Sequence, residues 1–217
     1  MDVFECIKSR RSIRKFLDTP VEWEKINHVL EAGTFAPSSG NLQNWRFIIT
    51  TDEDQKKELS EACFDQYWIA SAPVLITVVS ESEKVERFYG IRGERLYAVQ
   101  NCAAAIQNML LAANALGLGS CWVGAFDEIK VARVLKIPDS VRPQAILPLG
   151  YPDERVPTPN RYQLADKVFI EEYGNKIKDL SAFINDYSVV WQREAKKKVK
   201  EIKKLKDKIK ENFSKKQ

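Results

Sequence analysis

A cluster of arginines near the start of the chain is its first chemical signal. Arg10, Arg11 and Arg14 lie within five residues, together with the hydroxyl of Ser12. Guanidinium groups form forked, charge-assisted hydrogen bonds with phosphate, so the segment predicts an anion site. A solvated basic turn is the competing interpretation. Arginine-rich segments also bind nucleic acid, but no aromatic RNA-binding motif follows, so no specific nucleic-acid partner is expected.

Two loops carry further polar or flexible groups. The first contains Pro37, Ser38, Ser39, Asn41 and Gln43 and leads into a predicted strand. Its hydroxyls, amides and backbone groups suit a heterocycle with donors and acceptors on one edge, although an ordinary helix-to-strand loop explains the same composition. The second, GLGSCWVG at 117–124, follows a helix and precedes a strand. That order excludes a dinucleotide fingerprint and favours close approach of the backbone to a flat group.

Side-chain chemistry is otherwise restricted. His28 is the one histidine, which excludes multi-histidine metal sites, and we interpret it as a partly exposed helix residue rather than a proton donor. The cysteines form no C-x-x-C pair and predict buried thiols rather than a disulfide or zinc site; they are Cys6, Cys63, Cys102 and Cys121. No metal is expected, and the chemistry is expected to come from a bound group.

Hydrophobic patterning predicts helices that alternate with strands. Helices are expected over 2–8, 21–32, 52–63, 94–116 and 127–135, and strands over 45–51, 73–79, 120–124 and 142–149. The apolar run 73–79 suits a buried central strand. The helix 94–116 is apolar on most faces, with small residues along one side, so it is expected to pack on the sheet and on a partner subunit. The pattern indicates an α+β or α/β sandwich around one sheet.

Charge is distributed unevenly along the 217 residues. The net charge of +4 combines a tail from Trp191 to Gln217, with 12 basic and 4 acidic residues, and a remainder with 22 basic and 26 acidic residues. We predict a domain over 1–175 and a lysine-rich helical extension over 176–217. The tail is expected to wrap a partner or to be a solvated helix, and membrane or nucleic-acid contact is the weaker alternative. The start lacks a secretory signal, and no apolar run spans a bilayer, so the cytoplasm is expected.

Five segments in order resemble the nitroreductase family of flavoproteins. They are R-x-S-x-R at 10–14, the loop P-S-S-x-N-x-Q at 37–43 with Trp45, G-L-G at 117–119, L-G-Y-P at 149–152, and the basic Arg161. The resemblance covers residues 1–175. It implies an α+β fold, a sandwich around a mostly antiparallel sheet, and a homodimer in which each chain contributes to both sites.

The resemblance also implies FMN at the subunit interface. Arg10, Ser12 and Arg161 would hold the phosphate, with Arg11 near it, and Arg14 would lie toward the pyrimidine edge of the flavin. The ring would be lined from the partner by Pro37, Ser38, Ser39, Asn41 and Gln43. Trp122, Val123 and Gly124 would pack against the ring and offer backbone donors near N5. The chain departs from the family pattern at Asn44, often a proline, which is expected to loosen its loop, and at Asn101, often acidic, where an ion pair is expected to be missing.

The implied reaction is transfer of a hydride from NADH or NADPH through flavin N5 to a nitroaromatic, a quinone or a similar small acceptor, by a ping-pong mechanism. Two alternatives remain: a nonenzymatic flavin-binding or redox-sensing module whose basic tail recruits a partner, and a reductive dehalogenase-like member of the fold. Acceptor specificity is expected in loops 64–67 and 85–93. The sequence names neither the acceptor nor the preferred nucleotide.

Overall fold

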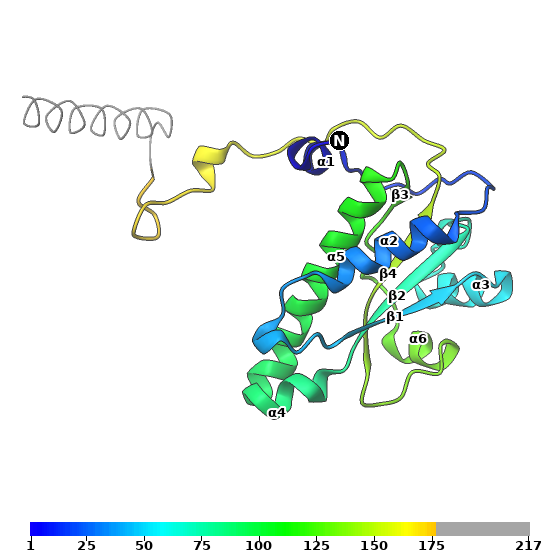
Figure 1. Ribbon diagram of the computed structural model, residues 1–217, viewed down its shortest axis with the longest axis horizontal. Coiled ribbons are helices and arrows are strands. Elements are labelled where there is room, and N and C mark those ends of the chain that lie inside the picture. Colours follow the sequence, from blue (N-terminus) through cyan, green and yellow to red (C-terminus); the bar gives the residue numbers. More distant parts are fainter. Residues whose placement is uncertain (177–217) are drawn as a thin grey trace, which may run out of the picture. The chain divides into compact units, whose positions relative to one another are not determined.

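Four strands form one antiparallel sheet in the computed structural model, which describes residues 1–176 (Figure 1). The strands are β1 (Trp45–Thr50), β2 (Val74–Ser80), β3 (Gly119–Ser120) and β4 (Arg142–Gly150), in the order β1-β2-β4-β3. All seven residues of β2 are buried, as expected of a central strand. The predicted mostly antiparallel sheet is therefore confirmed.

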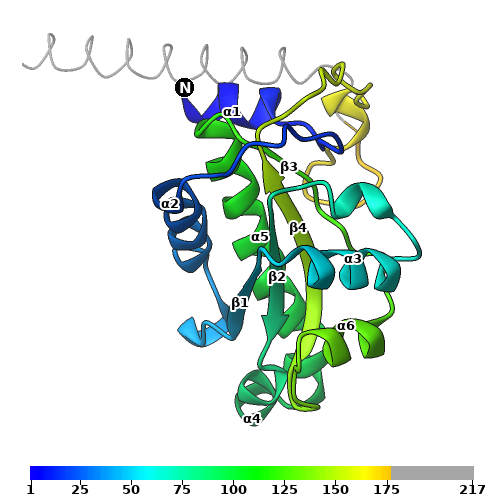
Figure 2. The same ribbon diagram turned by 90° about the vertical axis from the view of Figure 1, so that its right-hand side faces the viewer.

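Helices cover both faces of this sheet. Figure 2 shows α2 (Trp23–Thr34) and α5 (Ala98–Ala115) on one side, and α3 (Glu53–Ala62) and α6 (Glu128–Val134) on the other. Two apolar clusters match the two faces. The first includes Val78, Ile106 and Met109, and the second includes Leu59, Ile69 and Ile146. The α+β sandwich is confirmed, because each helix pair buries its apolar side against the sheet.

The ends of several helices follow local capping chemistry. The first helix, α1 (Val3–Ser9), begins with a capping box, in which the side chains of Asp2 and Glu5 accept each other's backbone N–H groups. Asp52 caps α3 by accepting the N–H of Gln55, and Asp127 caps α6 by accepting the N–H groups at 129 and 130. Short-range signals therefore place these three starts to within a residue.

The helix α5 is nearly enclosed but leaves one stripe open. A π-helical turn, Gly93–Tyr97, precedes it, so the regular helix begins four residues after the predicted start. Its buried side includes Cys102, Ile106 and Met109. On the outer side Val99 and Gln107 are exposed and Ala103 and Leu111 are half-buried, at intervals of four residues. Of these four residues only Ala103 is small, so the open stripe is not the small-residue side that the sequence predicts for partner contact; several small residues, among them Ala98, Ala105 and Ala113, are buried instead.

The prediction of a loop over residues 85–93 is wrong. Ser82–Arg92 forms a further helix, α4, which the sequence missed because five of its eleven side chains are charged and only Val85 is buried. Its backbone breaks at Gly90, where φ is +58°. Gly93 packs so closely on α4 that a Cβ there would lie 2.6 Å from the carbonyl oxygen of Val85. Tertiary packing rather than apolar periodicity therefore stabilises α4.

All four cysteines are free and buried, which confirms the prediction from their spacing. Burial raises the pKa of the Cys63 and Cys102 thiols to about 12, so both are neutral at physiological pH. Among the described residues there is no group of three or more His, Cys, Asp or Glu side chains suited to a metal ion. His28 is exposed on α2, as interpreted.

The chain divides into two units, Met1–Thr158 and Pro159–Gln217. As far as residue 176, the second unit contains one 3-10 turn, Leu164–Asp166, and a bridge between Phe169 and Lys176. No helix in the described part of the chain is long and apolar enough to cross a membrane. The helix predicted for the lysine-rich tail lies outside the described residues.

Candidate functional site

The arginine segment is held as an extra strand-like piece beside the sheet. The N–H of Ile13 donates to the carbonyl of Ser120 at 3.0 Å, and Ser12 forms a parallel bridge with the same residue. Farther along, the N–H of Leu17 donates to the carbonyl of Tyr151 at 2.9 Å. Backbone pairing on both sides therefore fixes the register of this segment against β3 and the end of β4.

Glu154 also binds the arginine segment. The sequence alone did not identify this residue. Its Oε1 accepts the N–H of Arg14 at 2.5 Å and that of Lys15 at 3.1 Å. The N–H of Asp153 donates to the carbonyl of Lys15 at 2.9 Å. The sequence around Glu154, after L-G-Y-P, does not indicate this role. The Glu154 carboxylate meets its partners only in the folded chain, because Arg14 is 140 residues away in sequence.

The glycine-rich segment is approached by the protein itself. A Cβ at Gly119 would lie 2.9 Å from Cγ2 of Ile13, so a larger residue has no space there. Gly117 has φ +75° and ends α5 in the left-handed conformation. The expected close contact at Gly119 is therefore present, but the group that makes it is Ile13 of the arginine segment, not a flat ligand.

The arginine side chains take different positions. Arg10 and Arg11 line a cavity of about 320 Å³ that also includes the backbone of Gly117–Ser120. Nη1 of Arg11 donates to the carbonyls of Lys8 at 2.7 Å and Arg10 at 2.8 Å, and Nη2 donates to Thr158. Nε of Arg11 is buried and has no partner among the described residues. Arg11 thus caps the end of α1, and its Nε is left as a buried donor without a partner among the described residues.

Arg10, Ser12 and Arg14 lie on the short segment that pairs with Ser120 at the end of β3, and Cys121 follows Ser120 in the chain. Burial raises the pKa of the Cys121 thiol, and the positive charge of Arg14 is the largest effect that opposes this rise. Arg14 is exposed, and its Cζ lies 5.6 Å from the ring centroid of Trp68, within the range of a cation–π contact. Three of the sequence-predicted residues therefore share one positively charged corner beside the end of β3.

The segment after β3 supplies fewer donors than expected. The N–H of Val123 donates to the carbonyl of Ile146 at 2.9 Å, and the N–H of Ile146 donates back. The expectation that Val123 offers a backbone donor is therefore wrong. Gly124 donates no hydrogen bond to another described residue, and Trp122 is 40% exposed. Trp122 and Gly124 are the two of the three that remain open.

The polar loop is folded on itself. Oγ of Ser38 accepts the N–H of Gln43 at 3.0 Å, and the Gln43 amide donates to Oδ1 of Asn41 at 3.0 Å. Gly40, Asn41 and Gln43 have φ values of +55°, +56° and +48°. Pro37 is exposed before this turn. The loop thus presents amides on a backbone that is costly for residues other than glycine.

The two departures from the family pattern meet each other. Nδ2 of Asn101 donates to Oδ1 of Asn44 at 2.7 Å, and both residues are buried. Nδ2 of Asn44 donates to Oγ of Ser80 at 2.8 Å. Oδ1 of Asn101 accepts from the N–H and the hydroxyl of Ser39, at 3.0 and 3.1 Å. The expectation that Asn44 loosens the loop is therefore wrong, because its buried amide ties the loop to the sheet and to α5.

The two groups of predicted residues lie at opposite ends of α5. The loop is bonded to Asn101 near the start of this helix, whereas Asn114 near its end donates to Cys6 and Ser9 just before the arginine segment. Asn101 and Asn114 are 13 residues apart, which at about 1.5 Å per residue is about 20 Å. Figure 1 shows α1 near one end of α5 and the loop before β1 near the other. One protomer does not bring them together.

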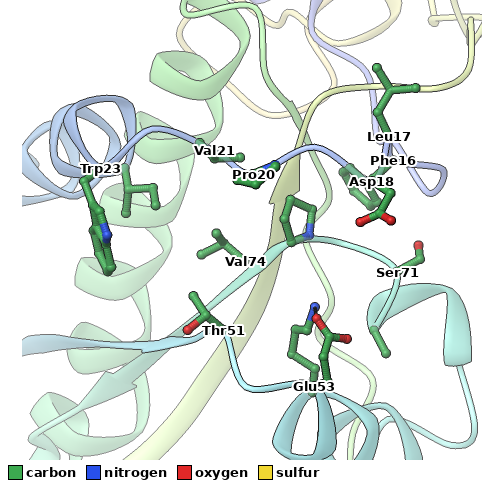
Figure 3. Close-up of a pocket in the computed structure, with 14 residues that line it drawn as sticks. Phe16, Leu17, Asp18, Pro20, Val21, Trp23, Thr51, Glu53, Ser71 and Val74 are labelled. Atoms are coloured by element: carbon green, nitrogen blue, oxygen red, sulfur yellow. Dashed lines mark ion pairs between the residues drawn. The ribbon is translucent and has the colours of Figure 1, made fainter.

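A larger cavity, of about 640 Å³, lies elsewhere and contains none of the predicted site residues. Figure 3 shows Asp18, Glu53 and Ser71 around one end of it and Trp23 toward the other. Glu53 pairs at 2.8 Å with the buried ammonium of Lys56, which also donates to the carbonyl of Ala72 at 2.9 Å. Since these partners already satisfy both charged groups, we place the candidate site at the arginine corner instead.

Arg161 belongs to the second unit and is exposed. Its predicted contact with the phosphate therefore stays a prediction.

Known proteins share both the sequence pattern and the fold. The model of the Nitroreductase family matches residues 7–151. A protein of Methanothermobacter thermautotrophicus, provisionally named NADH dehydrogenase/NAD(P)H nitroreductase, is 36% identical over 80% of this chain and 88% of its own. An FMN-dependent nitroreductase structure from Clostridium difficile has a TM-score of 0.69 and 28% identity, over 79% of this chain and 100% of its own. The structure of the Vibrio harveyi NADPH:FMN oxidoreductase complexed with NAD⁺ has a TM-score of 0.72 and 25% identity, over 88% of this chain and 84% of its own.

The chain belongs to the nitroreductase family, as the order of its five motifs predicted. It is an oxidoreductase of that family.

Gly119→Ala is expected to lower the free energy of unfolding by about 1–3 kcal/mol, because the new methyl overpacks against Ile13. Gly124→Ala is the matched control, since its Cβ would meet its nearest neighbour at an ordinary 3.5 Å. Urea unfolding of both variants measures the difference. Equal stability of the two variants would contradict the close packing of the arginine segment on β3.

Proposed function

We propose that the protein is an FMN-dependent NAD(P)H oxidoreductase that reduces nitroaromatics, quinones or similar small acceptors by a ping-pong mechanism. When bound, the flavin supplies the hydride chemistry at N5, and the protein supplies binding, orientation and charge. The observation that carries the proposal is the pairing of the arginine segment with Ser120 at the end of β3, beside a cavity that Arg10 and Arg11 line. The FMN and NAD⁺ named for the two structural relatives support this choice of cofactor and co-substrate.

The residues present fit a phosphate group. Arg10 lines the cavity with no side-chain hydrogen bond to another described residue, and the buried Nε of Arg11 lacks a partner. Unpaired buried donors are rare, so an acceptor from a ligand explains the unpaired Nε of Arg11, and the half-buried Arg10 lies beside it. Arg14, held on Trp68 and by its own backbone to Glu154, would place positive charge at the flavin edge that becomes anionic on reduction. Arg161 would join the phosphate contacts.

We further propose a homodimer that completes the site. The loop with Pro37, Ser38, Ser39, Asn41 and Gln43 and the arginine corner lie about 20 Å apart along α5. A two-fold axis that packs the open stripes of two α5 helices in opposite directions would bring the loop of one chain to the arginine corner of the other. Exposed apolar side chains on α1, Phe4 and Ile7, extend the surface available to the partner.

Residues 1–175 would form the flavin domain, and the lysine-rich extension would lie outside the chemistry. The free cysteines fit the reducing cytoplasm that the sequence predicts.

The direct test is reconstitution with FMN followed by anaerobic addition of NADH or NADPH. We expect a flavin spectrum that bleaches with at least one nucleotide and returns when a quinone or nitroaromatic is added after the oxidised nucleotide is removed. Stopped-flow absorbance follows both half-reactions. A protein that binds no FMN, or bound flavin that neither nucleotide reduces, would refute the proposed activity.

Arg10→Gln is expected to weaken FMN binding about ten- to a hundredfold, because charge-assisted hydrogen bonds contribute about 1.5–3 kcal/mol. Riboflavin, which lacks the phosphate, should bind the variant and the wild type alike. Titration of flavin fluorescence measures both ligands. Equal losses for FMN and riboflavin would contradict the assignment of Arg10 to the phosphate.

Val99→Arg is expected to convert dimer to monomer, because it places a charge on the open stripe of α5. Ile129→Arg on α6, 73% exposed in the wild type, is the control and should leave the dimer intact. Light scattering after size exclusion gives the mass, and FMN titration should show that the monomer loses affinity. A monomeric wild type, or a Val99→Arg monomer with full FMN affinity, would disprove the shared site.

A further inference from the structure

A line of buried hydrogen bonds connects the polar loop to the last residue of β2. Ser80 on β2 accepts from the amide of Asn44, Asn44 accepts from Asn101, and Asn101 accepts from Ser39 in the loop. Ser80, Asn44 and Asn101 are 0%, 0% and 4% exposed. A buried polar group destabilises the fold unless it forms hydrogen bonds. In this line each side-chain amide has a hydrogen-bond partner.

The line also fixes which way each amide faces. Nδ2 of Asn44 contacts Oγ of Ser80 and, at 3.4 Å, the carbonyl of Ala98 at the start of α5. Turning that amide over would direct its oxygen at a carbonyl, so its Oδ1 must face Nδ2 of Asn101. Asn101 is left with Oδ1 as an acceptor, and Ser39 supplies two donors to it. One orientation satisfies the whole line.

The loop depends on this connection more than its own hydrogen bonds suggest. Its internal bonds, from Gln43 to Ser38 and Asn41, shape the turn but do not place it on the molecule. The two bonds from Ser39 to Asn101 join it to a helix. Left-handed backbone at Asn41 and Gln43 is unfavourable and persists only where surrounding contacts impose it. Asn101 lies two residues from both Val99 and Ala103 of the open stripe.

We propose that Asn101, supported by Asn44, is a positioning residue that sets where the ring-lining loop of one subunit meets the flavin held by the other. The inference rests on the proposed function. In this proposal Asn101 does not contact the flavin. Its role is to position Ser39 and the neighbouring loop residues relative to the dimer surface. Its effect falls on recognition of the flavin ring and not of the phosphate.

The test compares Asn101→Ala with Asn108→Ala in the full chain. Asn108 lies two turns farther along α5, and its amide donates to the carbonyl of Ala32 at 3.1 Å, far in sequence from the loop. Both changes replace an asparagine of the same helix by alanine, so the change in helix propensity is the same in the two variants. The readouts are fluorescence titration with FMN and with riboflavin, and the circular dichroism of the bound flavin.

We expect Asn101→Ala to weaken FMN and riboflavin equally, by about tenfold, since two hydrogen bonds to the loop are lost. The flavin dichroism should change, while Asn108→Ala keeps wild-type values. Wild-type affinity of Asn101→Ala for both flavins, a loss confined to FMN, or equal losses in Asn108→Ala would overturn the inference. If Asn101→Ala fails to fold, Asn44→Ala provides the same comparison.

Failure of the proposed function gives a different result. A wild-type protein that binds no flavin refutes the activity itself, whereas a wild type that binds FMN beside an unaffected Asn101→Ala refutes only the positioning role.

Discussion

The packing of α5 on the sheet fixes the distance between the two halves of the candidate site. The helix is anchored by Cys102, Ile106 and Met109 against the apolar face of the sheet, so neither end is free to move toward the other. The loop is bonded near its first turn and the arginine segment lies beyond its last. A helix of this length separates them by about 20 Å, and the proposed homodimer is the arrangement that would bring the two halves together.

Both halves are built from irregular backbone that regular elements hold in place. Backbone N–H groups of the arginine segment donate to the carbonyls of Ser120 and Tyr151, and Glu154 accepts two more of its N–H groups. The polar loop takes its support from the amide of Asn101. Binding residues commonly lie on such segments, because loops present backbone and side-chain donors that helices and strands use internally. The surrounding helices and sheet provide the rigidity.

Local signals were sufficient for much of the fold. The apolar run 73–79 predicted β2, and the pattern along the chain predicted helices over 52–63, 94–116 and 127–135, all of which the structure confirms as elements. The helix α4 was missed because its charged side chains leave only a weak apolar periodicity, and Val85 is its only buried residue. The four-residue error at the start of α5 has a related cause, since the π-helical turn there packs against α4.

The sequence by itself determined the family, the sheet and the types of residue available for binding, because motif order, periodicity and caps are properties of short stretches. Only the tertiary structure decided how those residues are used. It directed Nη1 of Arg11 to two carbonyls at the end of α1, took the N–H of Val123 into the sheet, and joined Asn44 to Asn101 across 57 residues of chain. A hydrogen bond depends on where both partners lie, and partners distant in sequence meet only in the folded chain.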